Sequence, residues 1–186
     1  MIGVLPTTLK VGEKELPIKD TDFRVVLLIL QVFNDSELDQ DEKIYLMLDM
    51  LLGFDSLDPD DYHSAIMACY WFIDGGKEYK ARPQEPKVMD WEQDEQLIFS
   101  AVNHVAGKET RLEGYIHWWT FLGFFNEIQD GLFSYVLSIR QKKANGKKLD
   151  DSEKEYYRKN RDIIDLRKKE TEEERAFKDS ILAKFR

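Results

Sequence analysis

The segment GYIHWWTFLGFFNEI, residues 114–128, decides the fold of this chain. Written as a helix, it has apolar side chains on two separate faces. One face holds Tyr115, Trp118, Trp119, Leu122 and Phe125, and the other holds Phe121, Phe124 and Ile128. A helix that is apolar on both sides is either central in a core, the commoner case, or partly buried by another protein. Both alternatives stay open, and Trp118, Trp119, Phe121 and Phe125 are candidate partner contacts.

Helical segments surround this stretch on both sides. Capping residues before apolar periodic runs, and glycines after them, predict each helix. Two helices are predicted over 23–33, capped by Asp20 or Thr21, and over 36–52, ended by Gly53. Two more are predicted from Asp58 to Gly75–Gly76 and over 91–106, capped by Asp90. The last two are predicted over 131–143 and from Asp150 onward. Gln93 and Glu153 occupy the capping-box positions after Asp90 and Asp150.

The ends of the chain differ from this helical body. TTLKVGEKELPI, residues 7–18, predicts a small hairpin around Gly12, with Pro17 confining its second run to an edge. The proline-containing stretch 77–90 predicts a long loop within one domain. We therefore expect an all-α multi-helix bundle with an N-terminal β-hairpin over residues 1–164. Residues 165–186 are expected to form a charged, weakly held C-terminal helical arm.

The composition excludes several classes of protein. The 186 residues are 42% hydrophobic and 34% charged, which is enough apolar material for a core. No glycine-rich phosphate loop and no histidine pair at metal spacing is present, and Cys69 is the single cysteine. The acidic run 35–46 has Gln40 and Leu46 where a calcium loop needs glycine and glutamate. We expect no catalytic site, no cofactor and no metal.

No apolar run is long enough to cross a bilayer, and the N-terminus lacks a secretory signal, so we expect no membrane association and a cytoplasmic location.

Charge divides the chain into two parts. The formal net charge is −9, but the residues from 140 onward hold 16 basic and 11 acidic side chains, a net of +5, which leaves −14 for the rest. The basic cluster consists of Arg140, Lys142, Lys143, Lys147 and Lys148. It is either the solvated face of a helix or a tail that finds an acidic surface, including another copy of the chain. In that case Phe177, Ile181 and Phe185 would supply apolar contacts.

A family resemblance rests on three parts of the sequence. They are VLPTTLKVGEKELPIKDTDFR (4–24), Trp118-Trp119 followed by Phe121 and Phe125, and Gly146-Lys147-Lys148-Leu149 followed by Tyr156-Tyr157. Together they resemble the gene-fifteen-type family of tail-region proteins from bacteriophages of Gram-positive bacteria. The resemblance extends over most of the chain and brings no catalytic motif with it.

The resemblance implies a place in tail assembly. Such proteins are encoded between the major tail protein and the tape-measure protein, the position of tail assembly chaperones in long-tailed phages. Those chaperones coat the long, helical tape measure in the host cytoplasm, are displaced by polymerising tail-tube protein, and are absent from the finished virion. The expected function is therefore a non-enzymatic chaperone that binds tape measure and self-associates. The alternatives are a tail or connector component retained in the virion, and a nucleic-acid-binding regulator, which the acidic body disfavours.

Overall fold

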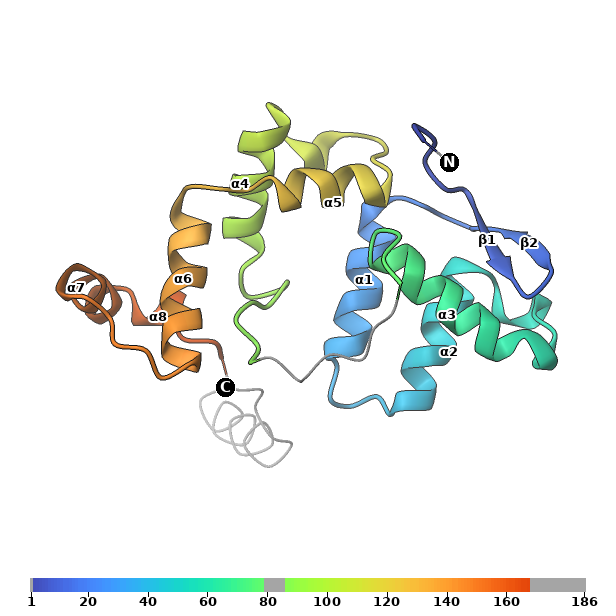
Figure 1. Cartoon of the computed structure of the whole chain (residues 1–186), viewed down its shortest axis with the longest axis horizontal. Helices are drawn as coiled ribbons and strands as arrows, with labels where there is room; N and C mark the ends of the chain where they lie inside the picture. The colour runs from blue at the N-terminus through green and yellow to red at the C-terminus, as the bar shows by residue number, and fades with distance from the viewer. Residues whose placement is uncertain (1, 79–85, 168–186) are drawn as a thin grey trace, which may run out of the picture.

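The structure, a computed structural model, describes residues 2–78 and 86–167. In this part of the chain eight α-helices and one two-stranded sheet form an arch (Figure 1). One end holds β1 (Thr8–Val11), β2 (Lys14–Pro17), α1 (Phe23–Asn34), α2 (Gln40–Leu51) and α3 (Tyr62–Ile73). The other end holds α4 (Glu95–Ala106), α6 (Leu132–Ala144), α7 (Asp151–Lys159) and α8 (Arg161–Ile164). The predicted all-α body with a small N-terminal hairpin is confirmed.

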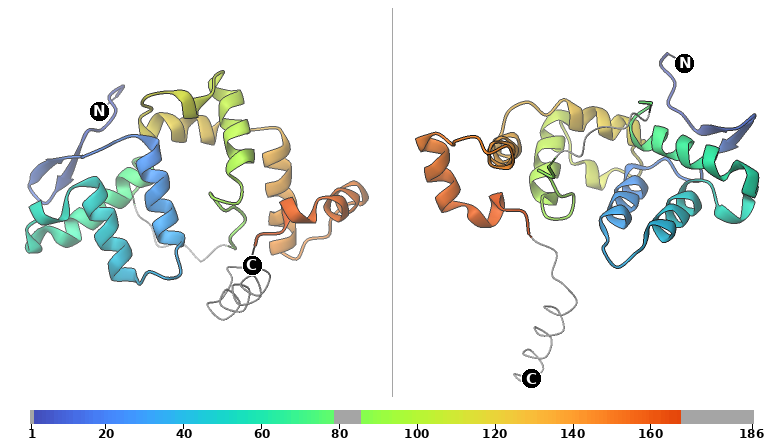
Figure 2. Two further views of the ribbon diagram at one scale, coloured as in Figure 1. Left: turned by 180° about the vertical axis from the view of Figure 1, so that it is seen from behind. Right: turned by 60° about the horizontal axis from the view of Figure 1, so that its bottom comes forward.

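Helix α5 (Trp118–Asn126) connects the two ends of the arch. It lies across the top and contacts both α1 and α4 (Figure 1). In the tilted view of Figure 2, the two ends are separate groups of helices, and α5 lies between them. Short 3-10 turns at Phe54–Ser56, Pro59–Asp61 and Thr110–Leu112 complete the described elements.

The hairpin packs its buried side chains on α3. Its strands are antiparallel with Leu9 opposite Leu16, and Leu9 and Val11 are buried. Gly12 turns the chain at φ +60°, a region that favours glycine. Its backbone N–H donates to the Ser64 hydroxyl of α3 over 2.6 Å. This bond fixes the turn to the helix beneath it.

Acidic residues precede the described helices α1, α2, α4 and α7, but the predicted starts of α2 and α4 are wrong. Asp150 and Glu153 form the predicted capping box of α7. Helix α2 begins at Gln40, four residues later than predicted, because Asp39 forms a capping box with Glu42. Helix α4 begins at Glu95, four residues later than predicted, so Gln93 lies before the helix and forms no capping box. Its side chain instead bonds residues 165 and 167.

The start of α5 also differs from the prediction. Residues 114–117 are not helical, and His117 forms an isolated β-bridge with Asp22 at the start of α1. The Trp118 N–H donates to the Thr21 carbonyl over 2.7 Å, and the Phe23 N–H donates to the Ile116 carbonyl over 2.9 Å. The helix therefore starts at Trp118. Tyr115 lies before it and does not share its face.

Two hydrophobic clusters stabilise the described fold. The larger one unites α1 to α5 and the hairpin, and its largest fully buried side chains include Phe23, Phe72, Trp118 and Phe121. The smaller one consists of Val136, Ile139 and Ile164, surrounded by side chains from α6, α7 and α8. Leu97 of α4 packs against both clusters and joins them. Within the described ranges, every helix is too short or too polar to span a bilayer.

Candidate partner-binding groove

The two tryptophans of α5 are held by hydrogen bonds to the end of α3. The indole N–H of Trp118 donates to the Ile73 carbonyl over 2.8 Å, and that of Trp119 donates to the Phe72 carbonyl over 2.9 Å. Carbonyls in the last turn of a helix lack intrahelical donors, so the indoles satisfy them. The backbone at Gly76 lies so close to the Trp119 ring that a Cβ at this position would be only 2.8 Å from it. Both tryptophans therefore serve the interior of the fold.

The phenylalanines of α5 pack in the same interior. Phe121 is buried and stacks on Phe23 of α1, with ring centroids 4.4 Å apart. Phe125 is half-buried between Trp91 and Phe133, at centroid distances of 5.0 and 6.0 Å. All four candidate contact residues of this helix thus touch other elements of the same chain. In this fold the four side chains therefore pack against other elements of the chain, with Trp118 and Phe121 buried and Trp119 and Phe125 partly buried.

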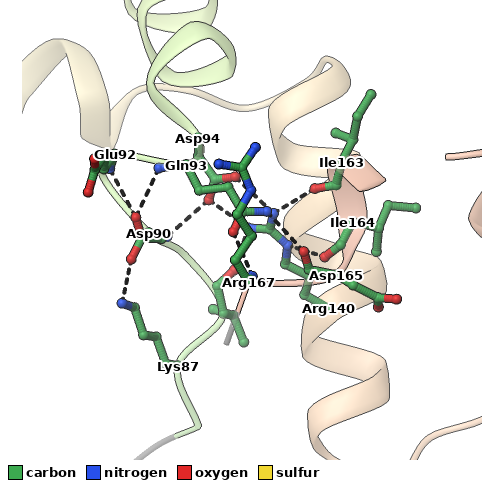
Figure 3. A network of polar contacts seen from close by, with 11 residues as sticks. Lys87, Asp90, Glu92, Gln93, Asp94, Arg140, Ile163, Ile164, Asp165 and Arg167 are labelled. Atoms are coloured by element: carbon green, nitrogen blue, oxygen red, sulfur yellow. Dashed lines mark hydrogen bonds and ion pairs between the residues drawn. The ribbon is translucent and has the colours of Figure 1, made fainter. Parts of the chain in front are cut away.

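Arg140 is buried, whereas the sequence analysis places it in a basic surface cluster. Its guanidinium binds both carboxylate oxygens of Asp94, over 2.6 and 2.8 Å (Figure 3). The remaining N–H groups donate to the carbonyls of Val88, Ile163 and Ile164, over 3.1, 2.8 and 2.6 Å. These bonds use all five guanidinium donors. The prediction is corrected: Arg140 is a clamp between α4, α6 and α8.

The rest of the basic cluster is largely neutralised. Lys142 pairs with Glu153, and the Lys143 ammonium pairs with Asp165 while lying 3.7 Å from the centre of the Tyr157 ring. The cluster members that form no salt bridge within residues 86–167 are Lys147 and Lys148, both exposed in the turn before α7. Two lysines make a small basic patch. Phe177, Ile181 and Phe185 lie outside the described residues.

A groove that the sequence analysis does not predict lies between α1 and the start of α4. These two segments face each other beneath α5 (Figure 1). The groove has a volume of about 390 Å³. Its apolar lining consists of Phe23, Leu27, Leu28, Trp91, Ile98 and Phe99. Leu28 keeps 51% of its surface exposed there, so the groove presents an apolar wall to solvent.

The two arginines at the rim of this groove are already engaged. Arg24 forms a salt bridge with Asp22 over 2.9 Å and donates to the Glu113 carbonyl over 2.6 Å. Arg111 binds both carboxylate oxygens of Glu109, over 2.8 and 2.9 Å. The hydrogen bond from Arg111 lowers the pKa of Glu109 to about 2, so this carboxylate stays charged. Both cations are therefore balanced locally.

The acidic side chains at the rim are not balanced in this way. Glu92 and Glu95 line the groove, and neither side chain forms a salt bridge in the part of the chain that the structure describes. The side-chain hydrogen bond with Glu109 is the main cause that raises the pKa of Arg111, and the charge of Glu95 raises it further by a smaller amount. The groove consequently combines apolar walls with a surplus of negative charge.

One sequence signal points toward this groove. The segment FRVVLLILQVF of α1 is apolar nearly throughout, but only Phe23, Val26 and Ile29 of this helix are buried. A helix with more apolar residues than one face can bury exposes the others. The opposite wall of the groove comes from residues 63 to 76 positions away in the sequence. This distance hides the groove from any local pattern.

A second hollow lies on the opposite side of α4, with a volume of about 910 Å³. The second half of α4 and residues 127–133 line it. Its lining mixes exposed Val105 and Leu132 with polar side chains such as Asn103 and Lys108. Since its lining is more mixed than that of the α1–α4 groove, we take the α1–α4 groove as the candidate site.

The single cysteine, Cys69, lies in the interior of the fold. It is buried, and burial raises its pKa to about 12. A protonated thiol is a poor nucleophile, so Cys69 is inert at neutral pH. Within residues 2–78 and 86–167, no group of three or more His, Cys, Asp or Glu side chains is placed to hold a metal ion.

Comparison with known proteins gives one match. No curated protein and no solved structure matches the chain. A family model described as bacteriophage Gp15 protein matches residues 1–166, which is most of the chain and nearly all of the described fold. The chain therefore belongs to the bacteriophage Gp15 protein family.

Proposed function

We propose that this phage protein is a non-enzymatic tail assembly chaperone that binds the tape-measure protein in the cytoplasm of the infected host. Membership of the Gp15 family supports a phage role. The observation that carries the proposal further is the α1–α4 groove, where the apolar side chain of Leu28 is 51% exposed. A chaperone needs an apolar surface that stays accessible until its client arrives.

The groove matches the general requirements of helix recognition. Amphipathic helices bind by placing apolar residues at helical spacing into a hydrophobic groove. Leu27 and Leu28 on one wall, with Trp91 and Phe99 on the other, provide such a surface. Aromatic side chains are favoured as anchors of protein contacts. A long helical tape measure would offer suitable segments along its length.

Self-association of the chaperone is part of the proposal. The described basic cluster offers it little, because three of its five members pair with carboxylates of the same chain. Among the described residues, contacts between copies would rest on Lys147 and Lys148, the two cluster members without a salt bridge there. Light scattering of the full chain at low and high salt tests this part, and a strictly monomeric protein at high concentration contradicts it.

Co-expression tests the tape-measure proposal directly. The tape-measure protein of the same phage should become soluble and co-purify with this chain, whereas alone it should aggregate. Leu28→Glu should abolish co-purification, because the new charge lies in the apolar groove. Leu132→Glu is the matched control, since Leu132 is 48% exposed and lies in the other hollow. Equal co-purification of both variants would reject the groove as the binding site.

The fate of the protein separates the chaperone from the retained tail component. Mass spectrometry of purified virions should detect the tape measure but not this chain. Its presence at stoichiometric amounts would favour the connector or tail component instead.

A further inference from the structure

The end of the described chain lies beside the candidate groove. The backbone N–H of Arg167 donates to the Gln93 side chain over 2.8 Å, and Gln93 in turn donates to the Asp165 carbonyl over 2.9 Å (Figure 3). Gln93 directly follows Trp91 and Glu92, which line the groove. The last 19 residues of the sequence, 168–186, therefore start close to the groove.

The length of the remaining chain is sufficient to enter the groove. Consecutive Cα atoms are about 3.8 Å apart, so Trp91 lies within about 8 Å of Gln93 along the backbone. Residues 168–174, fully extended, span up to about 23 Å. This length is enough to carry the chain from Arg167 around the turn at residues 91–94. Residues 175–186 can therefore reach the wall of the groove that contains Trp91 and Glu92.

The sequence of residues 175–186, RAFKDSILAKFR, suits an apolar groove with an acidic rim. Phe177, Ile181 and Phe185 are spaced four residues apart, with Leu182 next to them, which predicts one apolar stripe on a helix. The segment holds four basic residues and one acidic residue, a net charge of +3. Its apolar and charged groups thus complement those of the groove.

The charges of the groove favour a cationic occupant. Arg24 and Arg111 are bonded to Asp22 and Glu109, and they offer little to an incoming anion. Glu92 and Glu95 form no salt bridge within the described residues and remain available. Complementary charge of this kind sets the register and speeds the encounter, while the apolar contacts supply most of the affinity.

We propose that residues 175–186 occupy the α1–α4 groove of their own chain. A tethered segment has an effective concentration in the millimolar range, which favours this intramolecular occupant over the same segment of a second copy. Docking itself is independent of the tape-measure proposal. Its consequence, that the segment must leave before a client helix binds, rests on the proposed function.

Disulfide trapping in the full chain tests the docking. Leu28→Cys places a thiol in the groove, and Ser180→Cys places a nearly isosteric thiol beside the apolar stripe. The native Cys69 can stay, because it is buried and its pKa is raised to about 12. We expect the intrachain disulfide to form on the order of tenfold faster than in the matched control, Leu132→Cys with Ser180→Cys. Equal rates, or disulfides that link two chains and run as dimers, would overturn the proposal.

Charge reversal tests the predicted complementarity in the same assay. Glu92→Lys with Glu95→Lys should slow the intrachain disulfide severalfold, and added salt should slow the unaltered pair in the same direction. The control reversal is Glu127→Lys with Asp130→Lys, which lie at the second hollow and should leave the rate unchanged. If both reversals act equally, the acidic rim plays no specific part and the proposal is wrong. Since no tape measure is present, failure here leaves the co-expression result standing, and the reverse also holds.

Discussion

Replacing Arg140 by leucine should destabilise this protein more than any surface substitution. The side chains of Arg140 and Asp94 are 4% and 1% exposed, so their ion pair lies beyond the reach of solvent. Arg140→Leu removes the cation and leaves the carboxylate of Asp94 buried without a counter-charge. It also removes the donors to the carbonyls of Val88, Ile163 and Ile164.

The magnitude follows from these lost bonds. Breaking a buried ion pair by deleting one partner costs about 3–5 kcal/mol, most of it from the charge left behind. Each buried carbonyl left without a donor adds roughly 1–3 kcal/mol where water cannot replace it. A domain of this size has a free energy of unfolding of about 5–15 kcal/mol. We therefore expect Arg140→Leu to lose a third or more of that stability.

Urea denaturation, followed by far-ultraviolet circular dichroism, measures this loss. Lys147→Leu is the control, because Lys147 is exposed and should change the free energy of unfolding by less than about 0.5 kcal/mol. Arg140→Lys should fall between them, since an ammonium keeps the charge but has three donors for five acceptors. Arg140→Leu with Asp94→Leu should regain much of the loss by removing the stranded charge. A loss below about 1 kcal/mol for Arg140→Leu would refute the reasoning.

Three further predictions concern single residues. Trp118→Phe should cost about 1–3 kcal/mol in urea denaturation by leaving the Ile73 carbonyl unpaired, and no loss would mean that water replaces the indole. Cys69 should resist iodoacetamide in the folded protein and react in urea, because burial raises its pKa to about 12; rapid labelling when folded would show that the site opens. Partial burial would raise the pKa of Asp90, but hydrogen bonds from Gln93 and Lys87 outweigh it and lower the pKa. The stabilisation from Asp90 is therefore fully present above its unfolded pKa, near 4, and is lost as the pH falls through its folded pKa. Asp90→Asn should weaken the acid dependence of the melting temperature, and an unchanged dependence would contradict this assignment.

The sequence predicts the parts of the fold that depend on neighbouring residues. The capping box of Asp150 and Glu153 forms as expected, because both groups lie within one turn. Gly75 and Gly76 follow α3 with φ values of +69° and +85°, which few other residues tolerate. Where two caps compete nearby, the prediction fails by a few residues. Asp39 starts α2 because its side chain and that of Glu42 bond each other's backbone N–H groups, whereas the prediction began the helix at residue 36.

The features that the sequence does not predict depend on distant partners. Asp94 has the type and position of a helix cap, but its carboxylate binds Arg140, 46 residues away. His117 caps α5 by accepting the Trp119 N–H at Nδ1, while its Nε2 contacts the Pro6 carbonyl at 3.0 Å. Charge counting likewise treats Lys142 and Lys143 as free cations, although each has a carboxylate from a later segment. Composition gives the number of charges, and only the fold gives their pairing.

The buried Arg140–Asp94 ion pair lies next to one wall of the candidate groove and fixes its position. Asp94 fixes the first turn before α4 against α6 and α8 through Arg140, and Trp91 and Glu95, within four residues of it, line the groove. The same contacts hold residues 163–165 next to Gln93, from which the last part of the chain departs. The five hydrogen bonds of Arg140 depend on direction and therefore fix the relative position of the segments that they join. Contacts between apolar side chains alone would allow these segments to shift against each other. Arg140 therefore positions a wall of the groove and the starting point of the segment that we propose to fill it.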